Sequence, residues 1–474
     1  MSPLTIHQVP SMVSLAQYFD SVEDDMPEIQ VKHWDKLTPH RKVNEMSGSY
    51  LPAVGFASTP AVPMKKVKSF ADFAPSPSAG ESEDTCSNAE SGSSLAAVRP
   101  EFDPQSAADR AVQMDGLALA RSYLDALIMH GWEERAHLLR YSMADVETKL
   151  VTDGPLPWIA QLNEGRYLKK RPTEVRVDQV VQPYDASKFN FNKALQEEVL
   201  FQFERSATGI STFHAAKEIT EGSSPNLILV NVSPIEYAHI LLCPGTNRCQ
   251  PQLVDENNLT VALHLADETN NEHFRLGYNS LGAYGTINHM HYQAYYLQQP
   301  YPVELCETTL LGKTPEGVTL HRVEGYPCRL LAFEVENCLE ELARSVARVC
   351  KALADANVPH NLLICDKGHR VFLYPNLFSE RMARGLVPED VRETQINPAA
   401  FEISGHILVK KRSDYEVIDH DMVNRVLREA SCCEPMLDAI VDVALGKVED
   451  EAMHVGACGC DHCTMPHDEE EEEC

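Results

Sequence analysis

Two imidazoles and one carboxamide stand at alternate positions of a single short segment. His289, His291 and Gln293 lie within TINHMHYQAYYL, residues 286–297. If this segment is a β-strand, side chains two residues apart share a face, so the three groups point the same way. Polar groups are costly to bury without partners, and imidazole and amide groups donate hydrogen bonds to anionic oxygen. The pattern therefore favours a phosphate site.

Two other uses of these histidines have to be weighed. Histidines at i and i+2 can bind zinc, but a zinc site takes three or four ligands and no further Cys or His is obviously paired with these two. A purely structural histidine pair at a sheet edge is the second alternative. The preceding turn, Ser280-Leu281-Gly282-Ala283, favours catalysis, because glycine lets backbone approach a phosphate closely. We therefore assign no metal ligands.

Other chemically active residues are less specific signals. The densest basic cluster, GRYLKKRP, contains Arg166, Lys169, Lys170 and Arg171. It could capture phosphates or an acceptor anion, act as a nuclear-localisation patch, or form a solvated turn. His239 stands alone at the start of an apolar run, which favours a structural role. The tract CGCDHC, residues 458–463, lacks a second pair of ligands, so we favour a metal-free tail.

Composition excludes several classes of protein. The 474 residues include 70 acidic and 41 basic side chains, a net charge of −29, which disfavours broad nucleic-acid binding. No apolar run reaches the ~18–20 residues that span a bilayer, and the first residues lack a signal-peptide pattern. We expect a cytoplasmic protein whose cysteines are thiols, and the basic cluster leaves a nuclear location open. The lack of a Gly-x-Gly-x-x-Gly fingerprint or a phosphate-binding Lys-Ser/Thr loop disfavours dinucleotide-binding and ATP-loop folds.

The patterns along the chain predict the elements that hold these residues. Residues 1–112 are rich in Pro, Ser and charged residues, so we expect this N-terminal segment to be disordered. The tail at residues 448–474 ends in a run of acidic side chains that repel one another, so we expect it to be disordered as well. Helical spacing begins near Met114, and mostly strands follow from Val151. Gly405–Val409 resembles Ala238–Leu242, a weak repeat that suggests two related α+β halves in tandem. We expect strands at residues 226–232, 238–244, 275–280, 286–297, 328–335 and 401–412. We expect helices at residues 338–356 and 421–430, and a hairpin turn at residues 366–369.

Several longer segments resemble one family. INHMHYQAYYL, RLGYNSLGA, NVSPIEYAHILLCP, QLNEGRYLKKRPTE, SKFNFNKALQEEVLFQFE and ETQINPAAFEISGHILVKK are similar to segments of the GDP-L-galactose phosphorylases of plants and algae, in the transferase branch of the histidine-triad superfamily. The resemblance covers about residues 115–430 and leaves out both tails. It implies an α+β fold of two tandem histidine-triad-like halves with antiparallel sheets and packed helices, residues 113–300 and 301–447, with the histidine strand in the first half.

The resemblance also implies a mechanism. His291 would be the nucleophile, His289 would orient it through its backbone carbonyl, and Gln293 would hydrogen-bond the phosphoryl oxygens. Asn279 and Ser280 would contact phosphate, and Thr286 stands where relatives carry a small hydroxyl residue. Because glutamine does not titrate, it suits an enzyme that holds a covalent nucleotide until an anionic acceptor arrives.

The implied reaction converts GDP-L-galactose and inorganic phosphate to L-galactose 1-phosphate and GDP through guanylylated His291, a step of ascorbate synthesis. It requires no cofactor. Relatives dimerise through extended sheets, so a homodimer is an additional expectation. Three alternatives stay open: a GDP-D-glucose phosphorylase, a hexose-1-phosphate nucleotidyltransferase such as a uridylyltransferase, and a nucleotide-binding regulator without activity.

Overall fold

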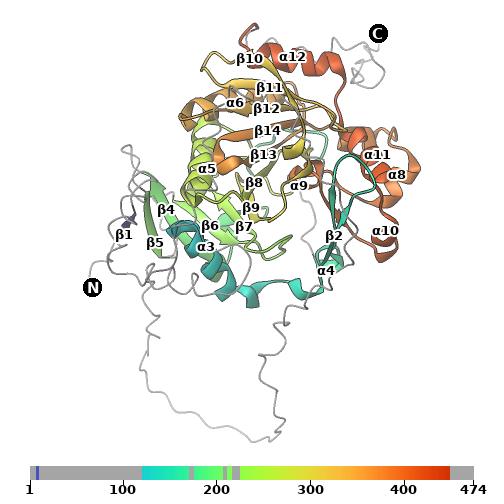
Figure 1. Ribbon diagram of the computed structural model, residues 1–474. Helices are drawn as coiled ribbons and strands as arrows, with labels where there is room; N and C mark the ends of the chain where they lie inside the picture. Colours follow the sequence, from blue (N-terminus) through green and yellow to red (C-terminus); the bar gives the residue numbers. More distant parts are fainter. Residues whose placement is uncertain (1–6, 10–119, 170–175, 206–210, 216–224, 449–474) are drawn as a thin grey trace, which may run out of the picture. The chain divides into compact units, whose positions relative to one another are not determined.

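A computed structural model describes residues 7–9, 120–169, 176–205, 211–215 and 225–448 (Figure 1). The predicted N-terminal extension, Lys170, Arg171 and the CGCDHC tract therefore lie almost wholly outside the described residues. Within the described ranges, none of the helices has the length and apolar character that crossing a membrane requires.

One large antiparallel sheet contains most of the strands that the structure describes. Its strands pair only with antiparallel neighbours. In spatial order the strands are β1 (His7–Val9), β5 (Ser211–Ala215), β4 (Val199–Arg205), β6 (Asn226–Val230), β7 (Ile240–Cys243), β9 (Tyr292–Tyr296), β8 (Phe274–Asn279), β13 (His360–Cys365), β14 (Arg370–Pro375), β12 (Leu331–Glu334), β11 (Thr319–Val323) and β10 (Thr308–Lys313).

This strand order separates the chain into two halves. Strands before residue 300 occupy one side of the sheet and strands after it the other, and the two sides meet where β8 pairs with β13. Outward from that junction, β8, β9, β7 and β6 have the same connections as β13, β14, β12 and β11. A long helix precedes each inner strand, α5 (Glu256–Thr269) before β8 and α6 (Leu339–Asp355) before β13. The α+β fold of two tandem halves is confirmed.

The second half does not repeat the histidine motif. If β13 is aligned with β8 residue for residue, the register of β14 puts Phe372 in the place of Gln293. The same alignment puts Arg370 in the place of His291, and Arg370 forms an ion pair of 2.5 Å with Glu334. Among the described residues, the motif therefore supplies one candidate nucleophile.

Helices cover one face of the large sheet. Helices α3 (Tyr123–Glu134), α5, α6 and α12 (Glu434–Ala444) form one apolar cluster with the strands beneath them. Helix α3 begins at a Ser122 cap that accepts from Asp125 N–H, and the Asp255 capping box starts α5. The helix expected after Met114 is present from Tyr123 to Glu134, but it is not amphipathic, because residues on nearly every side of it are buried.

A smaller sheet and short helices cover part of the other face. The sheet has the order β15 (His406–Val409), β3 (Trp158–Leu162), β2 (Glu147–Val151), and it joins the two halves because β15 runs parallel to β3. The helices are α4 (Glu164–Lys169), α7 (Phe378–Ala383), α8 (Glu389–Thr394), α9 (Ala400–Ile403), α10 (Arg412–Val417) and α11 (His420–Ala430).

Three expectations are corrected. The strand expected over 286–297 begins at Tyr292, so His289 and His291 lie in the loop that leads into β9. The strand expected over 401–412 is α9 followed by the short β15. The repeat of 238–242 in 405–409 is misleading, because β7 lies inside the large sheet whereas β15 belongs to the small one; the counterpart of β7 is β12.

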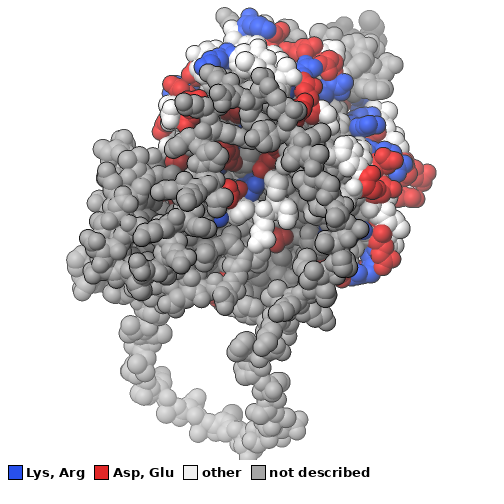
Figure 2. All heavy atoms as spheres, viewed as in Figure 1, with Lys and Arg blue, Asp and Glu red and all other residues white. Residues whose placement is uncertain are grey.

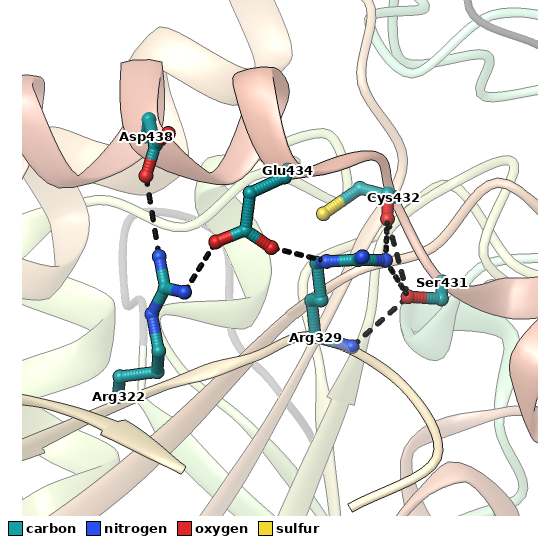
Figure 3. Close-up of polar contacts among 6 residues, drawn as sticks. All are labelled: Arg322, Arg329, Ser431, Cys432, Glu434 and Asp438. Carbon is teal, nitrogen blue, oxygen red and sulfur yellow. Dashed lines mark hydrogen bonds and ion pairs between the residues drawn. The ribbon is translucent and has the colours of Figure 1, made fainter. Parts of the chain in front are cut away.

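An ion-pair network links α12 to β11 and to Arg329, which precedes β12 (Figure 3). Glu434, at the start of α12, accepts from Arg322 on β11 and from Nε of Arg329 at 2.6 Å. Arg322 also pairs with Asp438 at 3.2 Å, and Arg329 donates to the Cys432 carbonyl at 2.9 Å. In the view of Figure 2, acidic and basic side chains are interspersed over the described part of the molecular surface.

Candidate active site

His291 has one ring nitrogen fixed and the other available. Its Nδ1 lies 2.8 Å from the backbone carbonyl of His289, and a carbonyl can only accept, so Nδ1 carries the proton. In the neutral ring, Nε2 therefore keeps its lone pair. Burial lowers the pKa of His291 to about 4, partly offset by the bond to the His289 carbonyl. The ring is thus neutral near pH 7, which is the nucleophilic form. The bond predicted between these two histidines is present.

The backbone of His291 is held by Gln252, a residue that sequence analysis missed. The buried amide of Gln252 accepts from His291 N–H at 2.9 Å and donates to the His291 carbonyl at 3.0 Å. The same amide donates to the Asn279 carbonyl at 3.1 Å. One side chain therefore ties the histidine loop to the end of β8, and no motif marks it in the sequence.

The side chain of His289 is a structural support. Its Nδ1 accepts from Phe191 N–H at 3.0 Å, and its Nε2 donates to the Thr246 carbonyl at 2.9 Å. The residue is 1% exposed and does not line the cavity described below. It holds the segment that carries Phe191, whose ring centre lies 4.9 Å from that of His291.

Gln293 lies on β9 with its amide oxygen facing His239. The Nδ1 atom of His239 accepts from Ile235 N–H at 2.8 Å, so the neutral ring carries its proton on Nε2. That Nε2 lies 3.2 Å from Oε1 of Gln293. Burial lowers the pKa of His239 well below its usual value, so the ring stays neutral. The structural role expected for His239 therefore includes orienting Gln293.

His291 and Gln293 open onto a cavity of about 370 Å³. Asn279, Thr286 and Arg166 also line it, as sequence analysis expected of phosphate-binding residues. The Oδ1 atom of Asn279 is occupied, since it accepts from Asn361 at 2.6 Å and from Ala400 N–H at 2.8 Å. Its amide nitrogen is the group with which it could donate to a ligand.

Two other expected ligand contacts lie elsewhere. Ser280 is fully buried; its hydroxyl accepts from His360 N–H at 2.8 Å and donates to the Leu281 carbonyl at 3.0 Å. Gly282, at φ +81°, packs so tightly on Pro359 that a Cβ would lie 2.8 Å from that ring. The turn at 280–283 therefore serves packing between the halves. Lys169 is exposed and outside the cavity lining, although its carbonyl accepts from Arg140 at 2.9 Å.

The second half supplies the opposite wall of the cavity. Segment 397–410, which includes α9 and β15, contributes Glu402 and Lys410 to the lining. Burial lowers the pKa of Lys410, and the nearby Glu402 carboxylate opposes that shift. Among the residues that the structure describes, Arg140, Arg166 and Lys410 are the cationic side chains of the lining, within an acidic protein. Guanidinium and ammonium groups can bind phosphate oxygens and stabilise the charge that develops during transfer.

These features are those expected of an enzyme that transfers a nucleotidyl group. A neutral buried imidazole with a free nitrogen, beside an amide donor and cations, can form a covalent bond to phosphorus and hold the resulting anion. Within the described residues, no group of three or more His, Cys, Asp or Glu could hold a metal ion.

The chain belongs to the GDPGP1-like family. The model of the family's N-terminal domain matches residues 123–295 and that of its C-terminal domain residues 302–450. GDP-L-galactose phosphorylase 1 of Arabidopsis thaliana is 45% identical over 325 residues, which cover 68% of this chain and 73% of the relative. GDP-D-glucose phosphorylase 1 of Homo sapiens is 30% identical, covering 63% and 77%. The crystal structure of yeast Ap4A phosphorylase Apa2 with Ap4A aligns at a TM-score of 0.45 and 14% identity, over 66% of this chain and 98% of that one.

Proposed function

We propose that this chain converts GDP-L-galactose and inorganic phosphate to L-galactose 1-phosphate and GDP through a GMP group on Nε2 of His291. The observation that carries the proposal is the bond from Nδ1 of His291 to the His289 carbonyl, because it leaves Nε2 free in the cavity. Similarity supports the choice of sugar nucleotide: identity is 45% to a plant GDP-L-galactose phosphorylase and 30% to a human GDP-D-glucose phosphorylase.

The first displacement transfers GMP to the enzyme. Nε2 of His291 attacks the α-phosphorus, the bond from that phosphorus to the bridging oxygen breaks, and L-galactose 1-phosphate leaves. The ring becomes positively charged in the adduct while Nδ1 keeps its proton. The His289 carbonyl, 2.8 Å from Nδ1, stabilises that charge without taking the proton.

The second displacement returns the free enzyme. An oxygen of inorganic phosphate attacks the α-phosphorus, the phosphorus–nitrogen bond breaks, and GDP leaves with the lone pair restored to Nε2. Gln293 would donate its amide hydrogens to the phosphoryl oxygens, with its oxygen held toward His239. Because an amide cannot remove a proton from water, the adduct waits for phosphate. Arg166 and Lys410, both in the lining, are the groups we assign to the incoming anion.

One experiment tests the whole scheme. Enzyme incubated with GDP-L-galactose without phosphate should gain the mass of GMP on the peptide that contains His291, and added phosphate should release GDP. His291→Ala should keep its fold by circular dichroism and lose both labelling and turnover. Turnover near the parent rate in that variant would refute the assignment. A panel with GDP-D-glucose and UDP-hexoses distinguishes the alternative substrates. The expected homodimer and cytoplasmic location belong to the same proposal; sedimentation and imaging of a tagged chain test them.

A further inference from the structure

The carboxyl ends of two parallel strands meet at the cavity. Strands β3 and β15 are paired as far as Leu162 and Val409, and the N–H of Asn163 donates to the Val409 carbonyl at 3.2 Å. Because parallel strands end at the same edge of a sheet, the residues that follow β3 and β15 lie close together. Helix α4 follows β3, and Lys410 directly follows β15. The two halves of the chain therefore both contribute to this edge.

Arg166, on α4, is anchored in the cavity wall close to Gln293. Its guanidinium donates to the Ser233 carbonyl, a bond that uses only part of the donor capacity of a guanidinium. Burial is the main cause of the lowered pKa of His239, and the charge of Arg166 adds to it. Nε2 of that histidine lies 3.2 Å from Oε1 of Gln293. The Arg166 guanidinium is therefore placed to bind an anion beside a phosphoryl group that Gln293 holds.

The aromatic ring of Tyr167, the next residue of α4, lies against the ammonium group of Lys410. Nζ of Lys410 is over the ring, 5.4 Å from its centre, within the ~6 Å at which an aromatic face attracts a cation. Both residues line the cavity. Tyr167 is 50% exposed, so its ring belongs to the wall of the cavity and not to a buried core. The contact joins the first half of the chain to the second.

We propose that Tyr167 is a positioning residue that holds the ammonium group of Lys410 for the inorganic phosphate bound by Arg166, an inference that rests on the proposed function. A lysine ammonium is a point charge on a flexible stem, so it has no fixed direction of its own. The Tyr167 ring restricts that freedom before the anion arrives, which lowers the entropic cost of binding. Because Lys410 follows β15, the phosphate site is complete only when β15 pairs with β3.

The two displacements use this site in different ways. Attacking and leaving groups lie roughly in line in phosphoryl transfer, so the departing sugar phosphate and the incoming phosphate both lie opposite Nε2 of His291. The sugar nucleotide also carries a base and two sugars that can contact the cavity, whereas inorganic phosphate has only its own oxygens. Loss of a well-placed cation should therefore weaken the binding of phosphate more than the binding of GDP-L-galactose.

The test measures KM for phosphate and KM for GDP-L-galactose in the full-length enzyme and its variants. Tyr167→Leu removes the aromatic face, whereas Tyr167→Phe keeps that face and removes only the hydroxyl. Leu168→Ala is the matched control, because Leu168 is the neighbouring residue of α4, is 75% exposed and lies outside the cavity lining. Circular dichroism checks the fold of each variant, and formation of the GMP adduct on His291 is measured without phosphate.

Tyr167→Leu should raise KM for phosphate by about five- to tenfold, the effect of one partly desolvated cation–π contact. Its KM for GDP-L-galactose should rise by no more than about twofold. Tyr167→Phe and Leu168→Ala should keep KM for phosphate within about twofold of the parent value. A Tyr167→Leu enzyme with the parent KM for phosphate overturns the inference, as does a Tyr167→Phe enzyme with the same defect as Tyr167→Leu.

Lys410→Met tests the inference without relying on the Tyr167 variants. This substitution should raise KM for phosphate by about tenfold or more, the effect of a lost bond to a charged group. Adding Tyr167→Leu to Lys410→Met should cause little further change, because the ring acts through the ammonium group. Full additivity, or a Lys410→Met enzyme with the parent KM for phosphate, overturns the inference. A parent enzyme that gains no GMP on His291 shows instead that the proposed function fails.

Discussion

The Nε2 atom of His239 lies 3.2 Å from Oε1 of Gln293 and 3.0 Å from Nδ2 of Asn231, and of these two neighbours only the Gln293 oxygen can accept a proton from the ring. The Ile235 N–H fixes the tautomer of His239, because it can only donate to Nδ1. His239, the buried residue directly before β7, thus orients Gln293 on the neighbouring strand β9. The Gln293 amide nitrogen is the donor that would meet a phosphoryl oxygen.

His239→Ala should lower kcat by about tenfold, the effect of one well-placed hydrogen bond, and leave KM for GDP-L-galactose nearly unchanged. Gln293→Ala should show a similar loss. If His239 acts only through Gln293, adding His239→Ala to Gln293→Ala should cause little further loss in kcat, which a double-mutant cycle measures. Full additivity of the two effects would exclude the positioning role.

Gln293→His should change the fate of the adduct. An imidazole at this position can exchange protons near neutral pH, so water becomes an acceptor that competes with phosphate. We expect the ratio of GMP to GDP released, measured by chromatography with labelled GDP-L-galactose, to rise about tenfold or more. Gln293→Asn, which cannot titrate, is the control and should release little GMP. Equal ratios in both variants would contradict the assigned role of the amide.

The sequence identified residues that line the cavity better than it predicted their local structure. The alternation of His289, His291 and Gln293 indicated a strand, but β9 begins only at Tyr292, because the loop before it is held by Gln252 and by the bonds of His289. Side-chain spacing cannot reveal such partners, which lie about 40 and 100 residues away in the chain. The three motif residues therefore have three different surroundings.

The opposite wall of the cavity was hidden for a related reason. Glu402 and Lys410 reach the site because β15 runs parallel to β3 and brings the second half across the first. A strand of four residues has almost no periodic signal, and its pairing depends on tertiary contacts. The architecture of two halves could be predicted from the resemblance. The pairing of β15, from the second half, with β3 in the smaller sheet could not be predicted in this way.

Glu434→Gln should weaken the attachment of α12. Arg322 and Arg329 both donate to this carboxylate, and their bonds lower its pKa, with Arg329 contributing most (Figure 3). The side chain is 44% exposed, so we expect a loss of only about 1 kcal/mol in unfolding free energy, smaller at high salt. Asp438→Asn, which removes one contact of a more exposed residue, is the control and should cost less. Equal losses in urea melts would show that Glu434 does not link the two arginines.

Stability should fall as the pH is lowered from 6.5 toward 4, because buried histidines stay neutral in the folded protein. Burial lowers the pKa of His360 to about 4, while Nδ1 is held by the Val358 carbonyl at 3.1 Å. Between the two pKa values the unfolded chain binds a proton that the folded chain does not, so stability rises with pH in this window. His291 and His406 act in the same direction, with pKa values lowered to about 4 and about 3. Asp125 and Glu236, whose pKa values burial raises to about 6 and about 7, act in the opposite direction.

His360→Asn isolates one of these contributions. The asparagine amide can replace Nδ1 in donating to the Val358 carbonyl but cannot bind the extra proton. The slope of unfolding free energy between pH 5 and 6, from urea melts, should therefore decrease by about 1 kcal/mol per pH unit relative to the parent. An unchanged slope in His360→Asn would mean that the folded protein accepts a proton at His360, and the buried junction between β8 and β13 would have to open to admit it.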